Sequence, residues 1–384
     1  MTAKSNGSAD GIAEESLSTT KWAIGLMSGT SLDGVDAALL RTDGEGFVEA
    51  GYGFTQPYEQ SFRDRLRTSF GKHAAPDKVV RDLTLYHAQA IDLVLRYTGL
   101  TPEEITVIGF HGQTIHHDAA AGVTVQIGDG SLLAAVTGVP VVDQMRLADM
   151  AAGGQGAPLA PAFHAAMASN HRDAPSGFLN IGGVANITYL GARDGDVLPE
   201  PVAFDTGPGN ALIDDWALTH TGRPFDENGA LAAAGQINHA VLNELLANRY
   251  FEQPYPKSAD RGDFGCEALN SLSPEDGAAT LVAFSVESMA RGIESLPQMP
   301  MRWWTSGGGR HNPQIMAGLR ARLAPAVIEP SETIGWAGDM VEAWAFAYLA
   351  MRSVKGLPIS FPGTTGVEKP ITGGRLHRPS ERAA

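Results

Sequence analysis

The feature that most constrains this chain is residues 23–40, which read Ala-Ile-Gly-Leu-Met-Ser-Gly-Thr-Ser-Leu-Asp-Gly-Val-Asp-Ala-Ala-Leu-Leu. An apolar run enters a turn of small residues at positions 28–31, and a second apolar run leaves from Val35. This pattern predicts a β-hairpin whose tip presents main-chain and hydroxyl groups. Glycine lets the main chain approach a ligand, and N–H and hydroxyl groups donate to an anion, so the tip suits a phosphate. An ordinary polar turn is the alternative, because the spacing matches neither the Walker-type loop nor the dinucleotide glycine fingerprint.

Two carboxylates beside this turn, Asp33 and Asp36, are candidate ligands for Mg²⁺. Mg²⁺ takes few protein carboxylates and usually keeps waters and phosphate oxygens. The sequence therefore predicts that a phosphate and Mg²⁺ bind at the same hairpin.

Length and charge narrow the class of protein. A chain of 384 residues is longer than one ordinary core serves, so two domains are expected. The net charge of −15 argues against nucleic acid as the main ligand, and no apolar run approaches the roughly 20 residues that cross a bilayer. An acidic protein that binds ATP must use backbone donors, helix termini and Mg²⁺, and 45 glycines fit that requirement.

The tail and the cysteine content bear on the compartment. Residues 1–20 are rich in Ser, Ala, Asp and Glu and have no apolar core, so they predict a disordered tail rather than a signal peptide. Cys266 is the only cysteine, which excludes an intrachain disulfide and fits a reducing compartment. We therefore expect a cytoplasmic protein with neither nucleic acid nor membrane as its partner.

The same order of elements occurs in both halves of the chain. A hairpin at 23–40 precedes a strand at 49–54 and a helix at 77–97, and a second glycine-tipped hairpin at 177–190 precedes a strand at 202–205 and a helix from 211. Further elements are predicted as strands at 106–110, 123–127, 139–142 and 302–305 and helices at 278–295 and 339–354, the last apolar almost all round. The predicted domains are 21–150 and 151–356, with 357–384 returning to the first domain and ending in disorder.

Six motifs in one order resemble the anhydro-N-acetylmuramic acid kinase family. They are Ser28-Gly-Thr-Ser-Leu-Asp-Gly-Val-Asp36, His111-Gly-Gln-Thr114, Ala152-Gly-Gly-Gln-Gly-Ala-Pro158, Asn180-Ile-Gly-Gly183, Phe204-Asp-Thr-Gly-Pro-Gly-Asn210 and Gly307-Gly-Gly309. The resemblance runs from about Trp22 to Leu376. It implies an α/β fold of two actin-like ATPase (ribonuclease H-like) domains facing a central cleft.

The resemblance also implies an activity. Members of this family phosphorylate 1,6-anhydro-N-acetylmuramic acid with ATP and hydrolyse the anhydro ring, which gives N-acetylmuramic acid 6-phosphate and ADP for peptidoglycan recycling. For this chain it implies ATP and Mg²⁺ as ligands, a sugar as substrate and a homodimer as the assembly.

The resemblance carries roles onto single residues. It implies Asp205 as the catalytic base and substrate contacts from His111, Gln113, Arg146 and Asp149. Glu342, a charge on an apolar helix, is a further candidate for substrate contact. Metal coordination is expected through Asp33, Asp36, Asp205 or water. The implied ATP-binding residues are Gly29, Thr30, Ser31, Leu32, Asp33, Gly34, Val35, Asp36, Gly182, Gly183, Gly207, Gly209, Asn210, Gly307, Gly308 and Gly309.

Several of these residues have a plain structural alternative. Asp205 precedes a helix and could cap it. His111 follows an apolar strand and could be a core histidine. Glu342 lies in an apolar helix and could form a structural ion pair with Arg146 or another arginine.

The chain departs from the resembling pattern at three places. Gln144-Met145 stand where the family usually shows Asp-Phe, and Met27-Ser28 stand where many superfamily members carry an aspartate. Residues 256–261 keep only Pro-Lys-Ser and an arginine of a longer pattern, which leaves their role open. Two other functions also stay open: a non-catalytic ATP-switched protein, and a kinase for an ordinary hexose or for acetate.

Overall fold

The computed structural model describes residues 20–29, 31–171, 173–195 and 199–379. Of the predicted disordered tail at 1–20, only Thr20 is described. The C-terminal segment is described to residue 379, so its last five residues lie outside the described residues. Thr30 also lies outside them. The chain forms two compact units. Unit 1 runs to Gly156 and adds Glu342–Ile359 and the chain from Ile371 on, and unit 2 comprises Ala157–Val341 and Ser360–Pro370.

These units correct the predicted domain limits in two respects. The helix α12 (Val341–Val354) belongs to unit 1 from Glu342 on, although the prediction placed it in the C-terminal domain. Ser360–Pro370 belongs to unit 2, although the whole segment after residue 356 was expected to return to the first domain.

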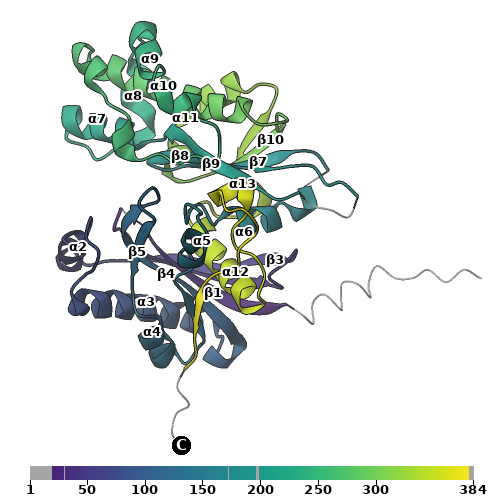
Figure 1. Ribbon diagram of the computed structural model, residues 1–384. Coiled ribbons are helices and arrows are strands. Elements are labelled where there is room, and N and C mark those ends of the chain that lie inside the picture. The colour runs from purple at the N-terminus through teal and green to yellow at the C-terminus, as the bar shows by residue number, and fades with distance from the viewer. Residues whose placement is uncertain (1–19, 30, 172, 196–198, 380–384) are drawn as a thin grey trace, which may run out of the picture. The chain divides into compact units, whose positions relative to one another are not determined.

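Unit 1 is built on a seven-stranded mixed sheet with the order β12-β6-β4-β1-β2-β3, and β5 pairs with β4 (Figure 1). Its strands are β1 (Lys21–Ser28), β2 (Gly34–Thr42), β3 (Val48–Pro57), β4 (Ile105–Asp118), β5 (Val123–Ile127), β6 (Val141–Asp143) and β12 (Arg375–His377). Its helices are α2 (Gln60–Arg67), α3 (Asp77–Thr98), α4 (Gly130–Thr137), α5 (Leu147–Ala151) and α12. The predicted hairpin, third strand and long helix are confirmed.

Side chains alternate between the two faces of β1. Ile24 and Leu26 join the core beneath α3, while Gly25 faces α12. Gly25 is paired with Gly109 of β4, and a Cβ on these residues would lie 1.7 Å and 2.0 Å from carbonyl oxygens of α12. The main chain of α12 therefore rests directly on two neighbouring glycines of the sheet.

Unit 2 is built on a five-stranded mixed sheet with the order β11-β10-β7-β8-β9. Its strands are β7 (Ser176–Ile181), β8 (Val184–Leu190), β9 (Val202–Pro208), β10 (Arg302–Ser306) and β11 (Val327–Pro330). Its helices are α6 (Pro161–Met167), α7 (Ala211–Thr221), α8 (Ala230–Ala234), α9 (His239–Leu245), α10 (Pro274–Glu294), α11 (Pro313–Arg322) and α13 (Pro362–Thr365). Short 3₁₀ helices include η4 (Arg249–Glu252) and η7 (Gly308–His311).

The two sheets share one topology. In each unit an antiparallel meander is followed by two strands parallel to its first strand, in the orders β3-β2-β1-β4-β6 and β9-β8-β7-β10-β11. The predicted α/β class and the predicted repetition of a hairpin in each half are confirmed. Among the residues that the structure describes, no helix combines the length and apolar character needed to cross a membrane.

The helix α10 forms the centre of the core of unit 2. It begins at Pro274 after Ser273, whose hydroxyl accepts a hydrogen bond from the Asp276 N–H at 3.1 Å. Serine as an N-cap with proline at the first helical position is a favoured start. The buried residues of α10 occur on almost every side, which places it between the sheet and the helices α7, α8, α9 and α11 (Figure 1).

Candidate nucleotide and substrate sites

The tip of the β1–β2 hairpin is anchored by an apolar side chain. The Leu32 N–H donates to the Gly29 carbonyl at 3.2 Å, and Leu32 has a φ of 60° while its side chain is buried. Val35 is also a core residue. A phosphate at this tip would therefore reach only the main chain of Leu32 and Val35, and Thr30 lies outside the described residues.

The glycines of the tip differ in what they allow. A Cβ on Gly34 would lie 2.2 Å from the Gln56 carbonyl oxygen, so packing against β3 requires this glycine. Apart from its chain neighbours, the nearest atom of the described residues to a Cβ on Gly29 would be the Ser31 hydroxyl oxygen, at 3.7 Å. The described packing around Gly29 thus does not require a glycine at this position.

The two carboxylates at the hairpin differ in exposure. The side chain of Asp33 is 71% exposed and lies 3.4 Å from an Arg63 nitrogen, whereas Asp36 accepts a 2.5 Å hydrogen bond from the Thr55 hydroxyl. No group of three or more His, Cys, Asp or Glu side chains suited to a metal occurs in the described part of the chain. Two carboxylates beside a phosphate-binding turn nevertheless fit Mg²⁺, which takes its other ligands from water and phosphate.

A polar cluster in unit 1 brings together four of the five predicted substrate residues. An Arg146 nitrogen lies 3.1 Å from His111 Nε2, and a second donates to the Gly156 carbonyl at 2.8 Å. The Gly156 N–H in turn donates to Asp149 Oδ1 at 2.6 Å. Glu342, the fourth member, interacts with Arg146 through its charge.

The protonation of His111 follows from these contacts. Burial, and then the charge of Arg146, lower the pKa of His111 well below its usual range, so the ring is neutral. Because the guanidinium can only donate, Nε2 is the acceptor. The proton therefore sits on Nδ1, which lies 3.0 Å from the Gly112 carbonyl oxygen. The alternative prediction for His111 was a core histidine. His111 is indeed buried, but it belongs to a polar cluster and not to an apolar core.

Glu342 lies in the first turn of α12 and keeps an exposed surface. Desolvation by the surrounding protein raises the pKa of its carboxyl, and Arg146 partly offsets that effect. No ion pair within 4 Å joins Glu342 to an arginine among the described residues. The structural ion pair considered for Glu342 is therefore not formed as a direct contact.

Gln113, the fifth predicted substrate residue, is used inside unit 1. Ser28 Oγ donates to Gln113 Oε1 at 2.7 Å and therefore accepts from the Tyr58 hydroxyl at 2.8 Å. Gln113 has no exposed surface. In this conformation its amide supports the base of the hairpin and offers no surface to a sugar, so its substrate contact stays a prediction.

The strand that carries His111 is longer than predicted. Leu26 of β1 pairs with Phe110, but Ser28 pairs with Gln113, so β4 contains an extra residue at this point. Gly112, with a φ of 70°, allows this bulge. Instead of ending at Phe110, β4 continues to Asp118 and pairs with β5.

Asp205 lies beside a second bulge, in unit 2. Ala185 of β8 pairs with Gly207 and Asn186 pairs with Asp205, which leaves Thr206 as the extra residue. Bulges of this kind re-aim side chains and are frequent next to active sites. The Asp205 carboxylate accepts a hydrogen bond from the Ala259 N–H at 2.9 Å, and the N-cap of α7 is Asn210. The capping alternative for Asp205 is therefore wrong.

Burial sets the protonation behaviour of Asp205. Desolvation raises the pKa of its carboxyl to about 6, although the hydrogen bond from Ala259 lowers it. A carboxylate with this pKa is ionised at neutral pH and is still basic enough to take a proton from water.

The glycine turns of unit 2 lie together. The Gly209 and Asn210 N–H groups donate to the Gly183 and Gly182 carbonyls at 2.9 and 2.8 Å. A Cβ on Gly308 would lie 3.5 Å from the Asn210 amide nitrogen. The structure thus brings Gly182, Gly183, Gly209, Asn210 and Gly308 together. Gly207 packs elsewhere, because a Cβ there would lie 3.0 Å from Phe251 and Ser288 atoms.

Close packing explains two further glycines of unit 2, Gly307 and Gly309. Gly307 has a φ of 77°, and a Cβ there would lie 2.4 Å from Asn180 Oδ1. A Cβ on Gly309 would lie 2.3 Å from the Ile181 side chain. Gly307 and Gly309 are therefore required by the fold itself, whatever they do for a ligand.

Arg310 was missed by the sequence analysis. Its side chain is 4% exposed, and its guanidinium donates to the Gly307 carbonyl at 2.9 Å and to Asp339 at 2.9 Å. It also contacts Glu332 at 3.0 Å. The only signal in the sequence is its position directly after three glycines.

Comparison with known proteins identifies the class to which this two-unit α/β chain belongs. Residues 21–378 match the profile of the anhydro-N-acetylmuramic acid kinase family. The chain is 50% identical to the anhydro-N-acetylmuramic acid kinase of Rhodospirillum rubrum over 358 residues, which cover 92% of this chain and 93% of that protein. It is 49% identical to the one from Paramagnetospirillum magneticum over 360 residues, or 93% and 99% of the two chains.

A solved structure that resembles this chain is component A of the (R)-2-hydroxyglutaryl-CoA dehydratase of Acidaminococcus fermentans. The similarity has a TM-score of 0.44 and 10% identity over 87% of this chain and 99% of that chain. The match over residues 21–378 and the identities near 50% are decisive. The chain belongs to the anhydro-N-acetylmuramic acid kinase family.

Proposed function

We propose that this protein transfers the γ-phosphoryl group of ATP to 1,6-anhydro-N-acetylmuramic acid and opens the 1,6-anhydro ring in the same reaction. The products are N-acetylmuramic acid 6-phosphate and ADP, in the recycling of peptidoglycan. The observation that carries this proposal is the 50% identity to a protein of that name over nearly the whole of both chains. The position of Asp205, half-buried beside a bulge within β9, supports it.

In the proposed reaction Asp205 is the general base. It accepts a proton from a water molecule, and the water oxygen bonds to the anomeric carbon of the sugar. The bond between that carbon and O6 breaks, and its electron pair stays on O6. O6 then bonds to the γ-phosphorus as the bond from that phosphorus to the ADP oxygen breaks. Proton transfer to a positioned base typically contributes ~10²–10⁴ in rate.

Other residues bind and orient the reactants in this proposal. In unit 1 the main-chain groups of residues 29–36 bind ATP phosphates. In unit 2 the glycine turns at 182–183, 207–209 and 307–309, together with Asn210, bind the nucleotide. Asp33 and Asp36 would hold Mg²⁺, which when bound neutralises phosphate charge. His111, Arg146, Asp149 and Glu342 orient the sugar, with His111 Nδ1 holding a proton.

We further propose that the protein works in the cytoplasm, where ATP is available, and that it forms a homodimer. The dimer is supported by the family resemblance alone, and light scattering after gel filtration measures it directly.

The hairpin tip provides a test of nucleotide binding. We expect Gly29→Val to weaken ATP binding at least about tenfold, or 1.4 kcal/mol, because the branched side chain occupies the space that a phosphate needs. The melting temperature without nucleotide should be nearly unchanged, because the nearest atom to a Cβ at Gly29, among the described residues beyond its chain neighbours, is 3.7 Å away. Isothermal titration calorimetry measures the affinity. Gly46→Val is the control, because among the described residues beyond its chain neighbours none comes within 4 Å of a Cβ at Gly46. Normal ATP affinity of Gly29→Val would exclude this turn as the phosphate site.

The reaction itself is tested with a panel of sugars and with labelled water. Incubation with ATP and anhydro-N-acetylmuramic acid, a hexose or acetate separates the proposed activity from the other kinases and from an ATP-switched protein. In ¹⁸O-labelled water we expect the label on the anomeric carbon of the phosphorylated sugar, and the phosphate ester should keep the original O6. A control for later anomeric exchange is needed. Label in the phosphate, or ring-opened sugar formed without ATP, would show that the two steps are separable and overturn the mechanism.

A further inference from the structure

The segment from Tyr250 to Ala259 contains the Pro-Lys-Ser pattern and takes no direct part in the proposed reaction. In unit 2 this segment contacts the outer side of β9 at Asp205. β9 is the last strand of its sheet, so its outward main-chain groups have no strand partner. At Asp205 the segment supplies those partners.

Three hydrogen bonds join the segment to Asp205. The Asp205 N–H donates to the Lys257 carbonyl at 3.0 Å. The Tyr250 hydroxyl donates to the Asp205 carbonyl at 2.5 Å. The Ala259 N–H donates to Asp205 Oδ2 at 2.9 Å. The contacts hold both main-chain polar groups of Asp205 and one of its two carboxylate oxygens.

The segment is itself held in place. Tyr250 is 5% exposed, and the Phe264 ring packs against its ring with centroids 5.5 Å apart. The Lys257 ammonium donates to the Tyr250 carbonyl at 3.0 Å and lies 4.5 Å from the centre of the Tyr250 ring. These contacts join Lys257 to Tyr250, so two of the residues that bond to Asp205 also contact each other.

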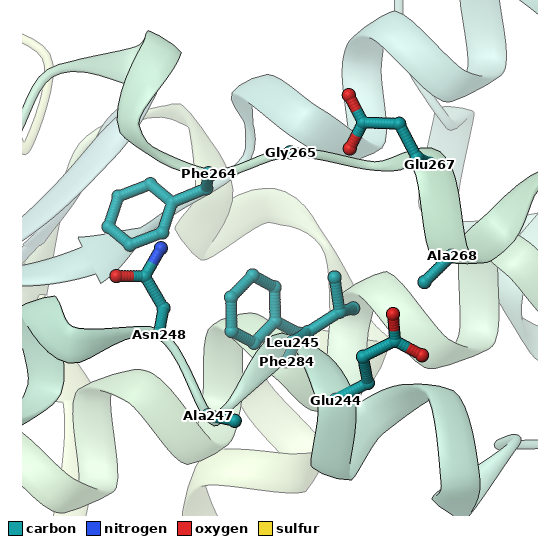
Figure 2. Close-up of a pocket in the computed structure, with 9 residues that line it drawn as sticks. All are labelled: Glu244, Leu245, Ala247, Asn248, Phe264, Gly265, Glu267, Ala268 and Phe284. Atoms are coloured by element: carbon teal, nitrogen blue, oxygen red, sulfur yellow. The ribbon is translucent and has the colours of Figure 1, made fainter.

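Phe264, which packs against Tyr250, also lines a hollow of about 320 Å³, and none of the predicted site residues lines it (Figure 2). Phe264 and Asn248 form one of its walls. Asn248 Oδ1 accepts from the Tyr250 N–H at 2.9 Å, and its amide nitrogen donates to the Asp263 carbonyl at 3.0 Å. Asn248 thereby caps η4, the short helix that carries Tyr250.

The second carboxylate oxygen of Asp205 is treated differently. Among the described residues of unit 2, none donates a hydrogen bond to Oδ1, whereas Oδ2 is bonded to Ala259. An oxygen that already accepts from a fixed N–H is less basic than its partner. The asymmetry selects Oδ1 as the more reactive of the two.

We propose that Tyr250, Lys257 and Ala259 form a positioning clamp on Asp205, which occupies Oδ2 and leaves Oδ1 as the oxygen that takes the proton. The inference rests on the proposed function, because the clamp can affect catalysis in this way only if Asp205 is the general base. These three are positioning residues because they act through Asp205.

The clamp also bears on the titration of Asp205. Burial raises the pKa of Asp205 and the Ala259 N–H lowers it. Among the charged groups around this stretch, Glu252, Lys257 and Arg291 line a hollow with Thr206, and Asp263 acts on Tyr250. Removing the Ala259 N–H therefore raises the pKa of Asp205, and the loss of activity at low pH begins at a higher pH.

The test compares variants of the full-length enzyme. Tyr250→Phe removes one hydroxyl and keeps the ring, and its matched control is Tyr255→Phe, in the same segment, whose ring stacks on Phe204. Ala259→Pro removes the N–H, while Ala259→Gly keeps it. For each variant, kcat, KM for the sugar, the pH profile of kcat/KM and the melting temperature are measured.

We expect Tyr250→Phe to lower kcat about tenfold with less than a threefold change in KM, and Tyr255→Phe to resemble the wild type. We expect Ala259→Pro to move the lower pH midpoint of kcat/KM upward by at least half a unit from about 6, and Ala259→Gly to keep it. A folded Ala259→Pro with an unchanged midpoint, or Tyr250→Phe with wild-type kcat, would overturn the clamp.

Two further results separate the clamp from the function on which it rests. If Ala259→Pro does not fold, the comparison of Tyr250→Phe with Tyr255→Phe decides alone. If the wild type fails to phosphorylate the anhydro sugar, the proposed function fails. If the wild type is active and Tyr250→Phe and Ala259→Pro behave like the wild type, the clamp fails and the function stands.

Discussion

Asp205→Asn should lower kcat by about 10³-fold or more while ATP binding is retained. The amide has nearly the shape of the carboxylate but cannot accept the proton from water, and the loss combines the contribution of a general base with misplacement of the water. Steady-state kinetics and calorimetry with ATP measure the two quantities. Asp214→Asn is a matched control, because burial raises the pKa of Asp214 to about 6 as well. If Asp205→Asn keeps a tenth of the wild-type kcat, Asp205 is not the base.

The same variant should be more stable than the wild type at neutral pH. The pKa of Asp205 is about 6 in the folded protein against 3.8 for the free group, so the folded state favours the protonated form. The wild type therefore loses stability, on the order of 2–3 kcal/mol, as the pH rises from about 4 through about 6. Asparagine does not titrate, so the difference in melting temperature should grow across that window. A difference that is the same at pH 4 and pH 8 would contradict the burial of a charged carboxylate.

Gly25→Ala should be the most destabilising single change considered for unit 1. The added Cβ would lie 1.7 Å from the Ala343 carbonyl oxygen and 2.5 Å from the Ala347 nitrogen, and both are main-chain atoms of α12 that cannot turn aside. The helix must move off the sheet, and we expect a loss of about 3 kcal/mol or more in the free energy of unfolding, or no folded protein.

The comparison for this prediction uses two other glycines. Gly109→Ala should have a similar effect, because its Cβ would lie 2.0 Å from the Phe346 carbonyl oxygen. Gly46→Ala should change stability by less than about 0.5 kcal/mol, since no atom lies within 4 Å of its added Cβ. Urea denaturation followed by circular dichroism gives the three values. Equal stabilities of Gly25→Ala and Gly46→Ala would show that α12 does not rest on the sheet as described.

Elements determined by local pattern were predictable from the sequence. The β1–β2 and β7–β8 hairpins follow from apolar runs around a turn, and α3 follows from the spacing of its apolar residues. The position of α12 was not predictable in this way. Its contacts with the sheet join residues about 300 positions apart, as in the hydrogen bond from Trp344 Nε1 to the Leu39 carbonyl, and no local pattern records which unit a buried helix covers.

The candidate site shows the same division. Asp205, His111 and Arg146 were found because each stands in a motif. The surroundings that give them their properties were not found, because the bulge at Thr206 and the hydrogen bonds of Asp205 to residues about 50 positions later depend on tertiary pairing. A glycine inside a strand, such as Gly109 or Gly112, was the one visible signal that a close approach or a bulge occurs there.

The return of the chain to unit 1 sets an order for its folding during synthesis. The first strands of unit 1 are made before any of unit 2, but unit 1 also needs α12, which follows most of unit 2. The sheet of unit 1 is completed by β12, which comes later still. The ribosome adds about 5–20 residues per second. Roughly 10–50 seconds therefore pass between the synthesis of β4 and that of α12, which covers Gly25 and Gly109. During that time the nascent first unit exposes one face of its sheet. A message that is cut short before α12 would therefore release a chain whose N-terminal unit never closes, which makes it a substrate for chaperones and proteases.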